Sequence, residues 1–198
     1  MKILLTGGGT LGSVTPLLAI VEAWRARDAT IEFVWIGTQN GPERKLIEEE
    51  YAIRFYQIPV ARFPRYVSIE WLFLPFRFLF AVLKCASIIQ KEKPDSIIGA
   101  GGFTQVPTIF AAQFFNVKCF ALQIDVQYLL STKLVSPFVK RLFFAWGDKA
   151  VGVPVRQSLL NCLKEKSDKP NVLVFGGGTG AEWLNEKIFE IAPQLCKE

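Results

Sequence analysis

The sequence contains no histidine among its 198 residues. Histidine is the usual general base near neutral pH and the commonest metal ligand, so its absence leaves acid–base chemistry to other side chains. The four cysteines are far apart and form no Cys-x-x-Cys pair, which argues against a metal centre or a disulfide framework. No uninterrupted apolar run reaches the roughly 20 residues of a membrane-spanning helix, and the first residues do not resemble a secretory signal. We therefore expect a protein without metal or cofactor, in a reducing cytoplasm.

Apolar and basic side chains are in excess. Hydrophobic residues make up 51% of the chain, the mean hydropathy is +0.27 and the net charge is +5. Much of the positive charge lies between residues 62 and 93, around the most aromatic stretch of the chain, residues 71–80. An apolar helix flanked by basic side chains is typical of a membrane-surface patch, and the alternative is the core helix of a large domain. The predicted patch, which is not a span, contains Trp71, Phe73, Phe76, Arg77 and Phe80.

Three apolar, strand-like runs end in glycines and continue into helix-like segments. They occupy residues 3–12, 96–102 and 172–181. Unbroken apolar runs that alternate with helices predict an α/β protein with a Rossmann-like, doubly wound parallel sheet. Glycine permits a tight turn and a close approach to a ligand, and the first amides of the following helix suit a phosphate group. We therefore predict diphosphate loops that contain Gly8, Gly9, Gly101, Gly102 and Gly177.

The pattern also predicts a helical stretch near residues 131–145 and strands over 149–153 and 172–175. A short polar segment that ends in proline is typical of a linker and begins at residue 167. It divides the chain into a Rossmann-like domain, residues 1–166, and a second part, residues 167–198. The second part supplies one β–α unit, which cannot bury its own faces. We interpret it as the start of a second domain, and the alternative is that its strand joins the first sheet.

Several motifs suggest ligand chemistry. Gly7, Gly9 and Gly12 have the spacing of a dinucleotide-binding fingerprint, but the second strand ends without the acidic residue that binds a ribose, so NAD-dependent oxidation is a weak alternative. Asp125 follows a predicted strand at the edge where doubly wound domains bind ligands. Arg156 lies in the first turn of a predicted helix, where a guanidinium can bind a diphosphate.

Taken together, the motifs resemble the MurG family of bacterial glycosyltransferases. The family pattern Gly-Gly-Thr-Gly-Gly-His-x-x-Pro is similar to Gly-Gly-Thr-Leu-Gly-Ser-Val-Thr-Pro at residues 8–16, and further matches lie at residues 37–43, 94–107, 153–156 and 176–185. The resemblance covers essentially the whole chain. It implies the N-terminal half of a two-domain GT-B fold, with the lipid acceptor and the membrane surface on the N-terminal side. The remaining residues would begin a truncated donor-binding domain.

The resemblance implies a hexosyltransferase of peptidoglycan synthesis, peripheral to the cytoplasmic face of the cell membrane. Such an enzyme transfers N-acetylglucosamine, with inversion, from UDP-N-acetylglucosamine to a lipid-linked muramyl-peptide diphosphate. The implied partners are this donor, the lipid diphosphate acceptor, an anionic membrane surface and the missing C-terminal domain, with no nucleic acid. The family's donor contacts correspond to Thr10, Leu11, Gly12, Asp125, Arg156 and Gly178. The candidate catalytic residues are Asp125 and Ser13, which stands at the family histidine position. The alternative is a non-catalytic or split half that docks on a membrane or on a donor-domain partner.

Overall fold

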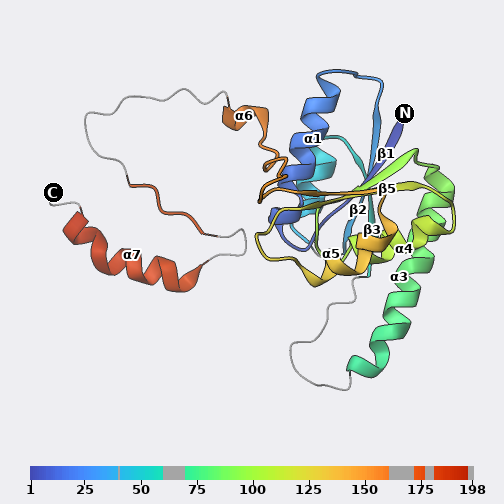
Figure 1. Ribbon diagram of the computed structural model, residues 1–198. Helices are drawn as coiled ribbons and strands as arrows, with labels where there is room; N and C mark the ends of the chain where they lie inside the picture. Colours follow the sequence, from blue (N-terminus) through green and yellow to red (C-terminus); the bar gives the residue numbers. More distant parts are fainter. Residues whose placement is uncertain (40, 60–69, 161–171, 177–180, 196–198) are drawn as a thin grey trace. The chain divides into compact units, whose positions relative to one another are not determined.

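A computed structural model of the chain describes residues 1–39, 41–59, 70–160, 172–176 and 181–195 (Figure 1). Residue contacts divide the chain into two compact units, Met1–Asn161 and Cys162–Glu198. The predicted domain boundary between residues 166 and 167 lies outside the described residues and stays a prediction. Each unit is therefore described by itself.

The first unit is built on a six-stranded sheet in which every neighbouring pair is parallel. The strand order is β3-β2-β1-β4-β5-β6. The strands are β1 (Lys2–Thr6), β2 (Glu32–Thr38), β3 (Arg54–Ile58), β4 (Ser96–Gly99), β5 (Lys118–Gln123) and β6 (Arg141–Phe144). The order reverses direction between β1 and β4, so the predicted doubly wound parallel sheet is confirmed.

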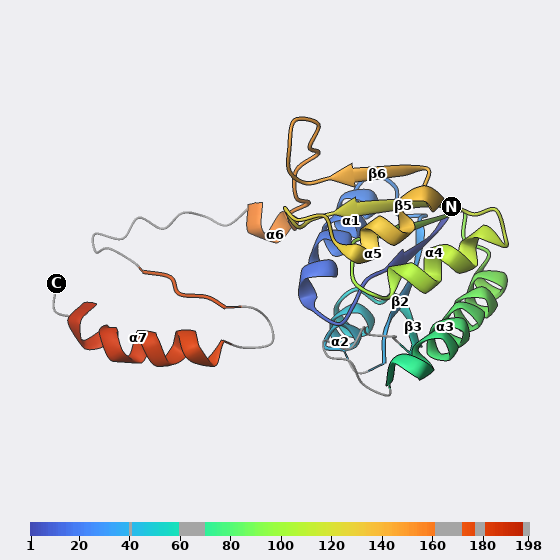
Figure 2. The ribbon, with the colours of Figure 1, turned by 60° about the horizontal axis from the view of Figure 1, so that its bottom comes forward.

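Helices connect the strands and cover both faces of the sheet (Figure 2). They are α1 (Thr15–Arg25), α2 (Glu43–Lys45), α3 (Glu70–Glu92), α4 (Gln105–Gln113), α5 (Leu130–Val135) and α6 (Gln157–Leu160). A 3-10 helix, Leu11–Ser13, leads into α1, and a π-helical turn, Leu46–Glu50, continues α2. The second unit contains α7 (Glu182–Leu195).

Side chains of successive strand residues point to opposite faces of the sheet and form two apolar layers. Leu4 of β1 packs in the layer that includes residues of α3 and α4, whereas Ile3 and Leu5 pack in the layer that includes residues of α1. All three side chains are fully buried. Burial of one such side chain contributes roughly 1.5–3 kcal/mol to folding, so β1 anchors both layers.

Three of the predicted elements are wrong. Residues 141–144 form strand β6 rather than the end of a helix, because they pair with Phe120–Gln123 of β5. Residues 149–153 form no strand: Gly147 and Gly152 both have positive φ, and a single hydrogen bond, from Val151 N to Phe144 O, returns the segment to β6. Residues 172–176 also form no strand. The described part of the second unit offers them no strand to pair with, and an unpaired strand leaves its backbone groups to water.

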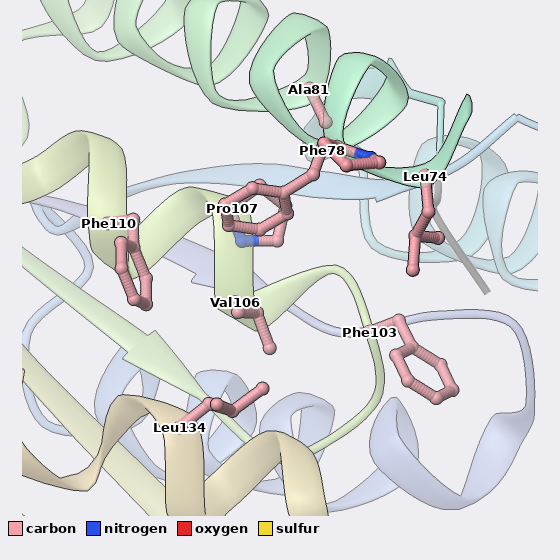
Figure 3. A pocket seen from close by; sticks show the side chains of 9 residues that line it. Leu74, Phe78, Ala81, Phe103, Val106, Pro107, Phe110 and Leu134 are labelled. Carbon is pink, nitrogen blue, oxygen red and sulfur yellow. The ribbon is translucent and has the colours of Figure 1, made fainter. Parts of the chain in front are cut away.

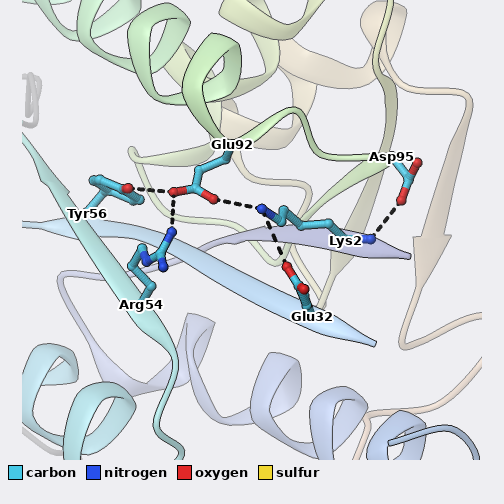
Figure 4. A network of polar contacts seen from close by, with 6 residues as sticks. All are labelled: Lys2, Glu32, Arg54, Tyr56, Glu92 and Asp95. Atoms are coloured by element: carbon cyan, nitrogen blue, oxygen red, sulfur yellow. Dashed lines mark hydrogen bonds and ion pairs between the residues drawn. The ribbon is translucent and has the colours of Figure 1, made fainter. Parts of the chain in front are cut away.

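A polar cluster lies at the amino-terminal edge of the sheet, where the parallel strands begin (Figure 4). The Glu92 carboxylate, at the end of α3, is almost fully buried. It accepts hydrogen bonds from Lys2 Nζ at 3.0 Å, Arg54 Nη1 at 2.9 Å and Tyr56 Oη at 2.6 Å. Burial by itself raises the pKa of Glu92, but the bonds from Tyr56, Arg54 and Lys2 outweigh burial and lower the pKa to about 2. The cluster therefore joins β1 and β3 to the end of α3 through one ionised carboxylate.

Candidate functional site at the carboxyl edge of the sheet

The first two glycine loops meet at the point where the strand order reverses. The first loop follows β1 and the second follows β4, which are adjacent in the sheet. A Cβ atom placed on Gly102, which has a φ of +75°, would lie 3.2 Å from Gly8 O and 3.6 Å from Ser13 Oγ. Ligands of doubly wound sheets bind in the crevice outside such a reversal. The structure therefore brings Gly8, Ser13 and Gly102 together at one candidate site.

The loop amides already have acceptors within the chain. Gly8 N donates to Ser13 Oγ at 3.0 Å, and Gly9 N donates to Glu43 Oε1 at 3.3 Å. Gly101 N donates to Gln105 Oε1 at 3.1 Å. A diphosphate that used these amides would have to displace three side-chain oxygens.

Ser13 is engaged in the first loop. Its Oγ, besides accepting from Gly8 N, lies 3.3 Å from Thr10 O and 3.5 Å from Gly8 O, and the side chain is buried. Thr10, Leu11 and Gly12 lie at the more open mouth of the loop, where the 3-10 helix begins without a side-chain cap. Amides at a helix start have no partner within the helix, so these three residues have the more accessible backbone.

The segment at residues 37–43, which matches the family pattern, contains a buried carboxylate, that of Glu43. Glu43 Oε1 accepts from Thr38 N at 2.8 Å and from Thr38 Oγ1 at 2.5 Å, in addition to Gly9 N. A Cβ atom on Gly8 or Gly41 would overlap the Glu43 carboxylate. The glycines therefore make room for Glu43, which joins the loop after β1 to the end of β2. Glu43 is the acidic residue of the family match at residues 37–43, but the motif alone assigned it no role at the site.

Buried polar atoms without a partner gather at the same edge. In the described part of the chain, three buried side-chain atoms lack a hydrogen-bond partner: Glu43 Oε2, Thr104 Oγ1 and Gln123 Oε1. They follow or end β2, β4 and β5, on the carboxyl side of the sheet. Buried polar groups are nearly always paired, so this clustering is a further mark of a functional edge.

Asp125 lies at this edge, two strands from the first glycine loop. Strands are about 4.8 Å apart, so β5 lies roughly 10 Å from β1. Asp125 is exposed. Gln123 Nε2 fixes the loop around it by donating to Asp125 O at 2.9 Å and to Gln127 O at 2.7 Å. The arrangement presents an exposed carboxylate at the edge where a ligand would bind.

Arg156 is held on α1, away from the glycine loops. Arg156 Nε donates to Glu22 Oε1 at 3.1 Å, and the guanidinium lies 5.5 Å from the centre of the Tyr51 ring. Burial alone raises the pKa of Glu22, but hydrogen bonds from Tyr51, Gln157 N and Arg156 outweigh burial and lower it. Burial and the bond to Glu22 raise the pKa of Tyr51 to about 12. Glu22 lies seven residues after the start of α1, a rise of about 10 Å.

Two predicted site residues, Gly177 and Gly178, lie outside the described residues. So does the side chain of Trp71 in the predicted membrane patch. The other members of that patch, Phe73, Phe76, Arg77 and Phe80, are all exposed on α3.

The second half of α3 packs inside the unit. Cys85, Ile88 and Ile89 are buried, and the burial of Cys85 raises the pKa of its thiol to about 12. By length and composition alone, Phe73–Glu92 could cross a membrane, contrary to the expectation from the sequence, although 28% of its apolar window is buried. A helix that packs one face on its own sheet cannot present that face to lipid, so the exposed apolar face of α3 is the part available to a membrane.

An apolar cavity of about 290 Å³ lies between α3, α4 and α5 (Figure 3). Leu74 and Phe78 line it from α3, Val106 and Phe110 from α4, and Leu134 from α5. Phe103, which directly follows the second glycine loop, also lines it. The cavity is therefore adjacent to the candidate site.

Comparison with protein families matches residues 3–144 to the glycosyltransferase family 28 N-terminal domain. Among the curated proteins to which this chain is similar are several named UDP-N-acetylglucosamine--N-acetylmuramyl-(pentapeptide) pyrophosphoryl-undecaprenol N-acetylglucosamine transferase. The protein from Borrelia turicatae is 32% identical over 98% of this chain and 58% of its own length. The protein from Clostridium botulinum is 36% identical over 94% of this chain and 57% of its own length. The chain thus spans less than two thirds of these relatives.

Solved structures support the fold. Acinetobacter baumannii MurG has a TM-score of 0.62 and 22% identity, covering 85% of this chain and 47% of that chain. A putative UDP-N-acetylglucosamine 2-epimerase from Listeria monocytogenes has a TM-score of 0.55 and 14% identity, covering 73% of this chain and 39% of that chain. At these identities the likeness shows a shared Rossmann-like half of a GT-B fold and nothing finer.

Proposed function

Because this chain belongs to glycosyltransferase family 28, through the N-terminal domain of that family, we propose that it is the acceptor-side part of an N-acetylglucosamine transferase of peptidoglycan synthesis. The donor is UDP-N-acetylglucosamine and the acceptor is a lipid-linked muramyl-peptide diphosphate. The names of the curated relatives support this choice of substrates. The observation that carries the proposal is the contact between the first two glycine loops at the reversal of strand order, where Gly102 lies beside Gly8.

In the proposed reaction an acceptor hydroxyl oxygen attacks the anomeric carbon of the donor sugar. A new carbon–oxygen bond forms, the bond to the diphosphate breaks, and UDP leaves with the electron pair. The hydroxyl proton passes to a base, for which the exposed carboxylate of Asp125 is the candidate in this chain. Ser13 instead has a positioning role, because its hydroxyl is bonded within the first glycine loop.

We further propose a peripheral location on the cytoplasmic face of the cell membrane. The exposed aromatic side chains of α3, with Arg77 beside them, support this location. Apolar insertion combined with attraction to anionic lipid is the usual basis of such binding, worth about 1 kcal/mol for each basic residue near the surface.

Arg156 would reach a donor diphosphate only after leaving Glu22.

The proposal predicts transfer by a chimera of this chain with the C-terminal portion of the Clostridium botulinum relative. Labelled N-acetylglucosamine is followed from UDP-N-acetylglucosamine to a short-chain lipid-linked muramyl-peptide acceptor. Asp125→Asn is expected to lower the rate at least about 100-fold, since a general base typically contributes that much. Asp28→Asn, an exposed change in the turn that follows α1, is the matched control and should keep the rate. A folded chimera without transfer refutes the proposal, whereas transfer unaffected by Asp125→Asn refutes only the assignment of the base.

A second candidate is a split half that works with a separate donor-domain chain. The second unit favours it, because Trp183 and Phe189 of α7 are 70% and 79% exposed and residues 172–176 form no strand. Such an amphipathic segment is expected to bury these side chains on a partner. Transfer restored by adding a separate donor-domain chain, rather than by covalent fusion, distinguishes this candidate.

A further inference from the structure

The cavity between α3, α4 and α5 is apolar on every side. None of its nine lining side chains carries a polar atom, and Phe78, Val106, Phe110 and Leu134 lie around the same space (Figure 3). A cavity of this kind cannot satisfy a sugar, a peptide or a phosphate, since each would bury polar groups without partners. A hydrocarbon is the kind of occupant that this lining suits.

The cavity lies next to the candidate site, because a residue of its lining is the chain neighbour of a residue of that site. Phe103 lines the cavity and follows Gly102, whose backbone lies against Gly8 of the first glycine loop. Consecutive Cα atoms are only about 3.8 Å apart. A ligand with a hydrocarbon chain in the cavity would therefore place its head group beside the second glycine loop, where it would have to displace the side-chain oxygens that accept from the loop amides.

Helix α3 connects the same cavity to the exposed apolar surface. Leu74, Phe78 and Ala81 repeat at helical spacing and line the cavity. Phe76 and Phe80, which are 71% and 61% exposed, lie on the opposite side of the helix. Pro75, which also lines the cavity, and Leu79, which is 56% exposed, lie between the two sides. A hydrocarbon chain could thus reach the cavity from a lipid surface over the apolar side chains of Pro75 and Leu79, on the side of α3 away from Arg77.

We infer that this cavity binds the isoprenoid chain of the acceptor next to its diphosphate. The inference rests on the proposed function, which supplies an isoprenoid diphosphate as the substrate. Its physical basis is the combination of an entirely apolar cavity with a glycine-loop site one residue away. The two sites together would bind the apolar chain and the polar head group of one molecule.

The test measures binding of farnesyl diphosphate, a soluble isoprenoid diphosphate, to the full chain by calorimetry. Inorganic pyrophosphate and straight-chain dodecyl phosphate are the comparison ligands. We expect farnesyl diphosphate to bind at least about tenfold more tightly than pyrophosphate, because only the former buries hydrocarbon. Leu134→Asp, which places a charge in the cavity wall at a half-exposed position, should remove this advantage. Phe114→Asp, at the exposed end of α4 and outside the cavity, is the matched control and should keep it.

A second measurement does not depend on the stability of the variant. A photoreactive farnesyl diphosphate analogue is expected to label peptides containing Phe78 or Phe110 in the unaltered chain. Equal affinity for farnesyl diphosphate and pyrophosphate, labelling elsewhere, or equally tight binding of dodecyl phosphate would each overturn the inference, the last by indicating membrane acyl chains. Binding in the cavity without sugar transfer by the chimera would support the inference and refute the proposed function, so the two failures are distinguishable.

Discussion

Replacing Glu43 with alanine is expected to lower the free energy of unfolding of the first unit by about 2–5 kcal/mol. The change leaves Thr38 N and Thr38 Oγ1, which are buried, and Gly9 N, which is partly buried, without their acceptor, and each unpaired buried group costs about 1–3 kcal/mol. Urea denaturation followed by circular dichroism measures the effect. Glu48→Ala, in the exposed ion pair with Arg44, is the matched control and should change stability by less than about 1 kcal/mol.

A double-mutant cycle tests whether residue 8 is glycine because a side chain there would overlap the Glu43 carboxylate. Gly8 does not have a positive φ, so Gly8→Ala is opposed by overlap with Glu43 rather than by backbone strain. In the Glu43→Ala background the added methyl group no longer meets the carboxylate, and Gly8→Ala should become less costly. We expect a coupling energy of about 0.5–3 kcal/mol. Additive effects of the two changes would contradict this explanation of the glycine.

Local pattern was sufficient to predict the edge of the sheet that holds the candidate site. The apolar runs before Gly7 and Gly99 are short and end in glycine, which indicates buried strands, and parallel strands place the loops that follow them at one edge. The partners of the loop amides were not predictable in the same way. Glu43 reaches Gly9 from 34 residues away, so the contact depends on the packing of β1 against β2.

The failures of prediction have the same origin. Residues 142–144 are apolar or aromatic, a composition that suits a helix or a strand, and only pairing with β5 selects the strand. Arg156 has a sequence position that suits a diphosphate, yet its nearest anion is Glu22, 134 residues earlier. Long-range pairs of this kind are set by the tertiary fold, which propensity and motif spacing do not describe.

Acid is expected to weaken the first unit through Glu92. The pKa of this carboxyl is about 2 in the folded chain and 4.5 for an ordinary glutamate, so the unfolded chain binds the proton more readily. The resulting stabilisation is fully present above about pH 4.5 and is lost as the pH falls through that value toward about pH 2. A shift of this size corresponds to about 3 kcal/mol at neutral pH.

Glu92→Gln isolates this contribution from the other carboxyl groups. An amide cannot ionise, so the variant should be less stable than the unaltered chain at neutral pH, and the difference between the two should shrink as the pH falls from about 4.5 toward about 2. Urea denaturation across this range measures the difference, and Glu186→Gln, on the exposed face of α7, should leave the acid dependence of the first unit intact. A difference that stays constant with pH would mean that Glu92 acts through packing alone. In that case the bonds from Lys2, Arg54 and Tyr56 would not stabilise its charge, and the amino edge of the sheet would be held by its apolar layers instead.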